Sequence, residues 1–159
     1  MPTRDLSARH ARRSGLFLLV TLAAAVVLPG TVLAADIVGT AGPDYLVGTP
    51  DADNIQGLGG PDVLRGRAGD DTLDGGNGRD RLFGGRGDDT LNGGARSDLL
   101  KGGPGSDTFD GGPGNDIIKA ARDGGTSDFV ACGDGMHDLA IVDANDIVAA
   151  DCEHVRIRP

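Results

Sequence analysis

The chain has 159 residues, enough for one domain, and its 24 acidic residues outnumber 15 basic ones for a formal net charge of −9. Aromatic residues make up only 3% and tryptophan is absent, which excludes a large aromatic core, while the 28 glycines exceed the usual share of about 7%. The charge disfavours nucleic acid and anionic membrane surfaces as partners, because these need clustered lysine and arginine.

Residues 1–34 have the pattern of a secretory signal peptide. A positive leader containing Arg12-Arg13 precedes an apolar stretch at residues 16–28, and residues 32–34 allow cleavage before Ala35. The apolar stretch is short for a membrane span of about 20 residues, so we expect cleavage rather than a retained anchor, by either the general secretory or the twin-arginine route. The chain from Ala35 carries 11 basic and 23 acidic residues, a net charge of −12, which favours a cation as its partner.

Residues 39–119 are a nine-residue unit written nine times without a gap. The first position is always Gly and the eighth is always a large apolar residue, from Leu46 to Ile118. The sixth position is always Asp: Asp44, Asp53, Asp62, Asp71, Asp80, Asp89, Asp98, Asp107 and Asp116. Three positions that stay in phase from Gly39 to Lys119 predict a solenoid.

The spacing inside the unit predicts its local structure. Positions one to six are turn chemistry, because Gly tolerates positive φ, and positions seven to nine form a short strand whose central side chain points inward. Two units make one coil, so each turn stacks on the next but one, about 4.8 Å away. The expected fold is all-β, a parallel β-roll (β-solenoid) spanning residues 35–119.

The type of acid indicates a ligand. All the acidic residues except Glu153 are Asp, the short carboxylate that reaches its own turn or an ion. Stacked carboxylates repel one another, and a hard divalent cation between turns would relieve this, with Ca²⁺ favoured over Mg²⁺ because Mg²⁺ demands tighter octahedral geometry. The alternative is that each Asp only accepts backbone N–H bonds within its turn.

The unit resembles the repeats-in-toxin, or haemolysin-type, calcium-binding nonapeptide repeat. That resemblance implies a parallel β-roll with Ca²⁺ between stacked turns, bound by the nine sixth-position Asp residues and backbone carbonyls, with seven sites if turn i pairs with turn i+2. The best-matching turns begin at Gly75, Gly84, Gly102 and Gly111. Weaker matches carry another residue at the second or fourth position: Thr40, Thr49, Leu58, Arg67, Asp51 and Arg96. The first two turns are interpreted mainly as an N-terminal cap.

Residues 120–159 lose the glycines but keep Asp-apolar triplets at 128–130, 138–140 and 146–148. The separation of Cys132 and Cys152 is close to one coil, which places them on neighbouring coils within reach of a disulfide, the expected state in a secreted chain. We interpret the segment as an irregular, disulfide-pinned C-terminal cap. The alternative is a loop with two free thiols.

These observations predict a secreted, non-enzymatic calcium-binding protein whose folding is coupled to Ca²⁺ after export. No Gly-x-Ser-x-Gly or His-Glu-x-x-His motif occurs, and nothing remains for a catalytic domain once leader, roll and cap are subtracted. The alternative is a calcium-stabilised surface or matrix interaction or adhesion module with an unknown extracellular or envelope partner. The exposed side chains expected at Val63, Phe83, Leu99 and Ile117 support that alternative.

Overall fold

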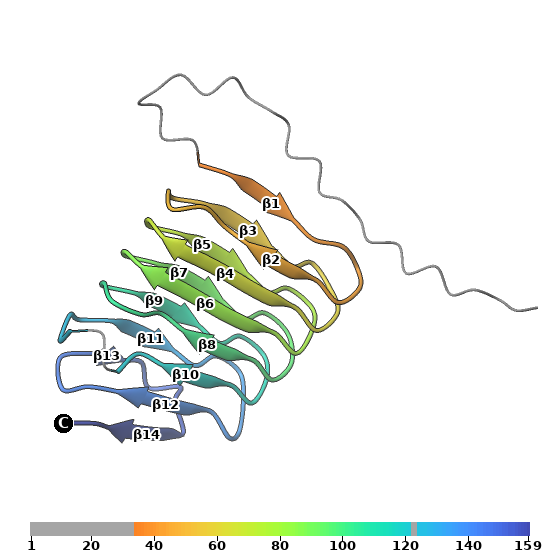
Figure 1. Ribbon diagram of the computed structural model, residues 1–159. Coiled ribbons are helices and arrows are strands. Elements are labelled where there is room, and N and C mark those ends of the chain that lie inside the picture. The colour runs from red at the N-terminus through yellow and green to blue at the C-terminus, as the bar shows by residue number, and fades with distance from the viewer. Residues whose placement is uncertain (1–33, 122–123) are drawn as a thin grey trace, which may run out of the picture. The chain divides into compact units, whose positions relative to one another are not determined.

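The computed structural model describes residues 34–121 and 124–159 (Figure 1), so residues 1–33 of the predicted leader lie outside the described residues. This part of the chain is built from short strands joined by tight turns, as the alternation of glycine-rich and apolar segments predicted. It contains no helix with the length and hydropathy of a membrane span.

Each nine-residue unit contributes one strand, and most strands are three residues long. The strands are β1 (Asp36–Val38), β2 (Tyr45–Val47), β3 (Asn54–Gln56), β4 (Val63–Ala68), β5 (Thr72–Asp74), β6 (Arg81–Arg86), β7 (Thr90–Asn92), β8 (Leu99–Lys101), β9 (Thr108–Asp110), β10 (Ile117–Lys119), β11 (Phe129–Ala131), β12 (Leu139–Val142), β13 (Ile147–Val148) and β14 (His154–Ile157). Strands β4 and β6 are longer than predicted because pairing continues through the start of the following turn, where Arg67 lies opposite Gly85.

Successive strands alternate between two parallel sheets, as Figure 1 shows. The odd-numbered strands form one sheet, in the order β1-β3-β5-β7-β9-β11-β13, and the even-numbered strands form the other, in the order β14-β12-β10-β8-β6-β4-β2. Within the repeats, each residue pairs with the residue two units further along the chain, for example Leu73 with Leu91 and Leu64 with Leu82. The predicted coil of two units is therefore confirmed.

The core is a single row of side chains from each sheet. The eighth-position residues from Ile55 to Ile118 are fully buried, and Leu46 in the first unit is 6% exposed. Val130 and Ala140 continue these rows beyond the repeats, and Val142 adds a second inward side chain on β12. One inward apolar residue per strand is a sparse core, so the turns have to hold the coils together as well.

The segment after Lys119 is irregular in spacing but keeps the parallel pairing. Strand β11 pairs with β9 and β13, and strand β12 pairs with β10 and β14. Phe109 lies opposite Val130 and Ile118 lies opposite Ala140, so the connections between these strands are longer than two repeat units. Cys132 and Cys152 form a disulfide with Cα atoms 5.1 Å apart, as predicted, and the two-thiol alternative is wrong.

Candidate metal centre

The sixth-position aspartates form two ladders, one along each edge of the roll, where each turn enters a strand. Eight of them expose 4% or less of their surface: Asp53, Asp62, Asp71, Asp80, Asp89, Asp98, Asp107 and Asp116. The Oδ1 atom of each accepts the backbone N–H of the residue at the same position one coil earlier, as when Asp89 Oδ1 accepts the Asp71 N–H at 2.9 Å. Half of each carboxylate therefore joins consecutive coils.

In most of these carboxylates the second oxygen is buried without a hydrogen-bond donor. This is so for the Oδ2 atoms of Asp62, Asp71, Asp80, Asp89, Asp98, Asp116 and Asp138. A buried acceptor that is left unpaired is costly, and a charged one more so. The alternative in which the aspartates only accept backbone N–H bonds within their own turns does not describe these oxygens.

Within the repeats, each of these Oδ2 atoms faces a space that exists because the first position of the turn is glycine. A Cβ atom at Gly75 would lie 2.8 Å from Asp80 Oδ2 and 2.5 Å from the carbonyl oxygen of Gly93, one coil on. At Gly57 the corresponding distances are 2.5 Å to Asp62 Oδ2 and 2.6 Å to the Gly75 carbonyl oxygen. The glycine thus leaves a cradle bordered by a carboxylate oxygen and a carbonyl oxygen.

Electrostatics in the ladders are unfavourable in the absence of a cation. Burial raises the pKa of Asp62 and Asp71 to about 6 and that of Asp89, Asp98 and Asp116 to about 7, against an ordinary value of 3.8. The backbone hydrogen bond to each carboxylate lowers these pKa values, and the charges of neighbouring aspartates raise them further. Such carboxylates bind either protons or a cation.

In the first two turns a threonine at the second position supplies donors to the second carboxylate oxygen, Oδ2. Asp44 Oδ2 accepts the backbone N–H of Thr40 at 2.6 Å and its hydroxyl at 2.9 Å. Asp53 Oδ2 accepts the N–H of Thr49 at 2.5 Å, and the Thr49 hydroxyl also donates to this carboxylate. We call these two turns, residues 39–44 and 48–53, the threonine-type turns.

The seven turns that follow share a different backbone at the second position. There φ is positive in every case, at Leu58, Arg67, Gly76, Gly85, Gly94, Gly103 and Gly112. We call these the glycine-type turns. Leu58 and Arg67, with φ of 71° and 97°, adopt this conformation although they are not glycine, as does Arg96 at the fourth position with 86°. The turns at 57–62 and 66–71 are therefore built like the best-matching turns.

The ladders continue past the nine predicted aspartates. Asp128 Oδ1 accepts the Asp107 N–H at 2.7 Å, and Asp138 Oδ1 accepts the Asp116 N–H at 2.6 Å. At the end of one ladder the only Glu, Glu153, accepts the Asp138 N–H through Oε2 at 3.0 Å. The prediction omitted these three residues, although the Asp-apolar triplets at 128–130 and 138–140 were the signal that could have found two of them.

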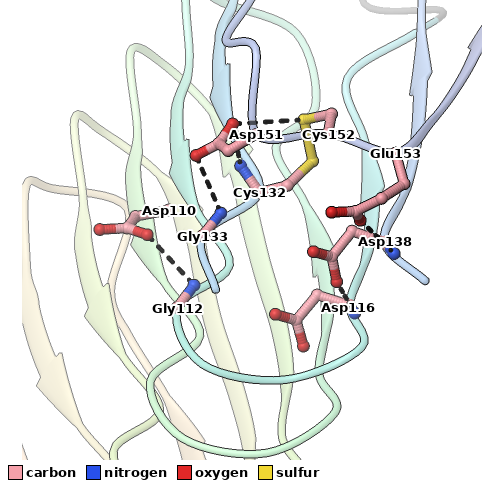
Figure 2. The surroundings of a disulfide bond; sticks show 9 residues. All are labelled: Asp110, Gly112, Asp116, Cys132, Gly133, Asp138, Asp151, Cys152 and Glu153. Atoms are coloured by element: carbon pink, nitrogen blue, oxygen red, sulfur yellow. Dashed lines mark hydrogen bonds between the residues drawn. A yellow bond between two sulfur atoms is a disulfide. The ribbon is translucent and has the colours of Figure 1, made fainter. Parts of the chain in front are cut away.

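Residues 151–153 close the last coil around the disulfide, as Figure 2 shows. Asp151 accepts the backbone N–H of Cys132 at 3.3 Å and that of Gly133 at 3.1 Å. In earlier coils the first-position N–H donates to a backbone carbonyl of the next coil, for example Gly93 N–H to Asp110. The Asp151 side chain supplies the acceptor where no further coil of this kind follows.

The donor set fits a hard cation that takes oxygen ligands. Within residues 34–121 and 124–159, no group of three His, Cys, Asp or Glu side chains converges as a ligand cluster. One carboxylate per turn must therefore be joined by backbone carbonyls, such as those that border the glycine cradles. All-oxygen coordination that mixes carboxylates with carbonyls is typical of Ca²⁺ sites.

Fold and site together define a class: a parallel β-solenoid with metal-binding turns stacked along its edges. The family model of the RTX calcium-binding nonapeptide repeat matches the chain in four copies, at residues 34–60, 47–82, 56–91 and 83–118. The chain belongs to this family, whose repeats bind Ca²⁺, and Ca²⁺ is its cofactor. A search of curated proteins finds no match to the chain.

Proposed function

We propose that the protein is a secreted, non-enzymatic calcium-binding protein whose Asp/Gly turns ligate Ca²⁺ between stacked coils and which folds on calcium after export. The observation that carries this proposal is the row of buried Oδ2 atoms without a hydrogen-bond donor in the glycine-type turns of Asp62, Asp71, Asp80, Asp89, Asp98 and Asp116. Bound Ca²⁺ would neutralise these carboxylates and link one coil to the next.

The nine sixth-position aspartates are not equal as proposed ligands. Those of the glycine-type turns offer an Oδ2 atom beside a neighbouring carbonyl, as Asp80 does beside Gly93. Asp44 and Asp53 already accept donors from Thr40 and Thr49, so they belong to the part of the roll that closes its N-terminal end. Asp138 extends the proposed ligand set beyond the repeats, since its Oδ2 is also buried without a hydrogen-bond donor.

Coupling between calcium and folding follows from the balance of forces in the roll. The core contributes one inward side chain per strand, while the ladders bring like charges to successive coils. Ligands that come from turns one coil apart exist together only in the folded chain, so the binding energy becomes folding energy. At the affinity of extracellular calcium modules, about 10⁻⁴–10⁻³ M, the chain would stay unfolded inside a cell and fold outside it.

Export and chain organisation complete the proposal. The predicted leader at residues 1–34 would direct the chain out of the cell and be removed, leaving a nine-repeat roll at 35–119 and a cap at 120–159. The Cys132–Cys152 disulfide supports this assignment, because disulfides persist in oxidising compartments. The calcium turns then serve to assemble the chain, not to catalyse a reaction.

A second candidate is a calcium-stabilised surface or matrix interaction module. Of the four side chains predicted to be exposed, Ile117 is 40% exposed, whereas Val63, Phe83 and Leu99 are half-buried, and Tyr45 on the same sheet is 63% exposed. In this case the calcium roll is the scaffold and an outer face binds the partner. A calcium-dependent pull-down from the surrounding matrix distinguishes this module from a free calcium-binding protein.

The test is a Ca²⁺ titration of residues 35–159, followed by far-UV circular dichroism, with Mg²⁺ as the control. This part of the chain contains the buried core, the disulfide and every strand of the residues that the structure describes. The proposal expects a cooperative transition from coil to strand with Ca²⁺ alone. A chain that is fully folded in chelator at neutral pH, or that responds equally to Mg²⁺, contradicts it.

A further inference from the structure

The outer face of the even-stranded sheet combines cations with apolar side chains. On strands β4, β6, β8 and β10 the residues that flank each buried side chain include Arg65, Arg81, Lys101 and Lys119, all exposed. Lys101 and Lys119 are the only two lysines in the chain. No Asp or Glu occupies an outward position on these strands or on β2, although the chain has 24 acidic residues. We call this surface the basic face.

The opposite sheet has a different outer surface over the same coils. Strands β5, β7 and β9 place Thr72, Thr90 and Thr108 in one outward row, with Asp74 and Asp110 at the ends of the neighbouring row. Both surfaces are built on the same nine-residue frame, so the fold alone does not require the difference. The separation of charge between the two sheets is a property of this sequence.

Arginine and aromatic rings pack together on the basic face. The guanidinium carbon of Arg65 lies 5.2 Å from the centre of the Phe83 ring and 5.8 Å from that of Tyr45, one coil to either side. These contacts are cation–π interactions, which hold the charge close to the sheet instead of letting it extend into water. The result is a shallow surface in which cations, aromatic rings and aliphatic side chains such as Ile117 alternate.

We propose that the basic face binds the surface of an anionic phospholipid bilayer. Basic side chains are attracted to anionic headgroups, while aromatic and aliphatic side chains between them enter the boundary with the acyl chains. Because these groups lie on one face of stacked parallel strands, they can meet a bilayer together. If a second copy of the chain docked face to face, its basic side chains would repel those of the first. A purely polar polyanion would leave the apolar side chains of the basic face exposed to water.

This inference rests on the proposed function, because the basic face exists only when the coils are stacked. Calcium also changes the long-range field, since each bound ion removes two negative charges from a chain whose residues from Ala35 sum to −12. The net charge of the whole chain disfavours anionic membranes. The proposal depends instead on how the charged side chains are distributed over the surface. Binding is therefore expected only for the calcium-loaded protein.

The experiment is co-sedimentation of residues 35–159 with vesicles in saturating Ca²⁺, using phosphatidylcholine alone and an equal mixture with phosphatidylglycerol. The test variant replaces Arg65, Arg81, Lys101 and Lys119 with glutamine. The matched control replaces two exposed turn arginines that lie outside the strands, Arg79 and Arg96, with glutamine, and it is compared with the pair Lys101→Gln and Lys119→Gln, which removes the same charge from the basic face. Circular dichroism of the same samples reports whether each variant has folded on calcium.

The proposal expects binding to the mixed vesicles only, a loss of about tenfold or more in affinity for the basic-face variant, and little change for the control. Equal loss in the two matched double variants would show diffuse attraction or calcium bridging and would overturn the assignment. Equal binding to neutral vesicles would overturn it too, as would folded protein that ignores vesicles but is retained by an immobilised acidic polysaccharide. Failure of the proposed function is distinguishable, because the chain would then show no calcium-dependent folding in circular dichroism.

Discussion

The threonine-type and glycine-type turns of this roll satisfy the same buried aspartate in different ways. In the turn at 48–53, Thr49 supplies an N–H and a hydroxyl to Asp53. In the turn at 84–89, the positive φ of Gly85 directs its N–H to the carbonyl oxygen of Gly102 on the next coil instead. Asp89 Oδ2 is then left without a donor.

This difference shows what the second glycine of the repeat contributes. Its role is commonly read as tolerance of a tight turn, yet the threonine-type turns are also tight and keep the same strand register on either side. The glycine conformation withdraws a donor from the carboxylate and so leaves the oxygen available to a cation. A threonine at the second position supplies that donor, so the turn does not need a cation.

The largest effect should come from removing calcium at different pH values. The pKa values of the buried aspartates are raised in the folded state, so the metal-free fold is most stable below the ordinary pKa of 3.8 and loses stability as pH rises towards 7. In calcium-free buffer we expect more strand signal at pH 5 than at pH 8. With saturating Ca²⁺ the fold should persist at pH 8, and calcium affinity should fall on acidification because protons compete for the same oxygens. Circular dichroism at both pH values measures this, and a metal-free fold that is more stable at pH 8 contradicts it.

A substitution in each kind of turn should separate the two classes. Asp89→Asn keeps an oxygen that can accept the Asp71 N–H but loses the charge, so we expect the calcium midpoint for folding to rise and stability in Ca²⁺ to fall by roughly 1–3 kcal/mol. Asp44→Asn serves as the matched control and should leave the midpoint unchanged, at a cost of about 1 kcal/mol or less. Calcium titrations of both variants decide the matter, and equal shifts in the midpoint would remove the distinction between the turns.

Much of this architecture could be predicted from the sequence because the repeat is strictly periodic. The phase of Asp and apolar residues was enough to place the strands, the coil of two units, the inward row and the carboxylate ladders. The disulfide followed from the same spacing. What the pattern could not assign was the separate role of each carboxylate oxygen, since that depends on which way a neighbouring N–H points.

Two further features were hidden because they depend on neighbouring coils. Asp138 and Glu153 continue a ladder although the nine-residue phase is lost, because parallel pairing of β12 with β10 and β14 absorbs the extra or missing residues in the turns. The conformation of Leu58 is set together with the coil that stacks on it, where a Cβ atom at Gly76 would lie only 2.5 Å from the Leu58 carbonyl oxygen. The residue type at the second position therefore predicted a weaker match for the turn at 57–62 than its conformation shows.

An exchange at the second position should move a turn from one class to the other. Thr49→Gly removes the hydroxyl and permits positive φ, so Asp53 would lose donors. We expect stability without calcium to fall by about 1–2 kcal/mol and the number of bound Ca²⁺ ions to rise by one. Thr49→Ser, which retains the hydroxyl, is the control. Isothermal titration calorimetry gives the stoichiometry, and an unchanged number of ions for Thr49→Gly would show that the threonine does not exclude the cation.

The smallest effect should come from Arg67→Gly, which is expected to raise stability where the other substitutions lower it. Arg67 holds φ at 97°, a conformation that costs a non-glycine residue about 1–2 kcal/mol. Glycine relieves this strain but loses more backbone entropy on folding, so the expected net gain is about 0.5–1 kcal/mol in saturating Ca²⁺. Arg67→Ala removes the same side chain without relieving φ and should bring no gain. In calcium-free buffer at pH 5, where the metal-free fold is expected to persist, the melting temperature should thus rise for Arg67→Gly and fall for Thr49→Gly, the same replacement at the same repeat position one coil apart. If both changes lower it, the glycine conformation is not what separates the two kinds of turn.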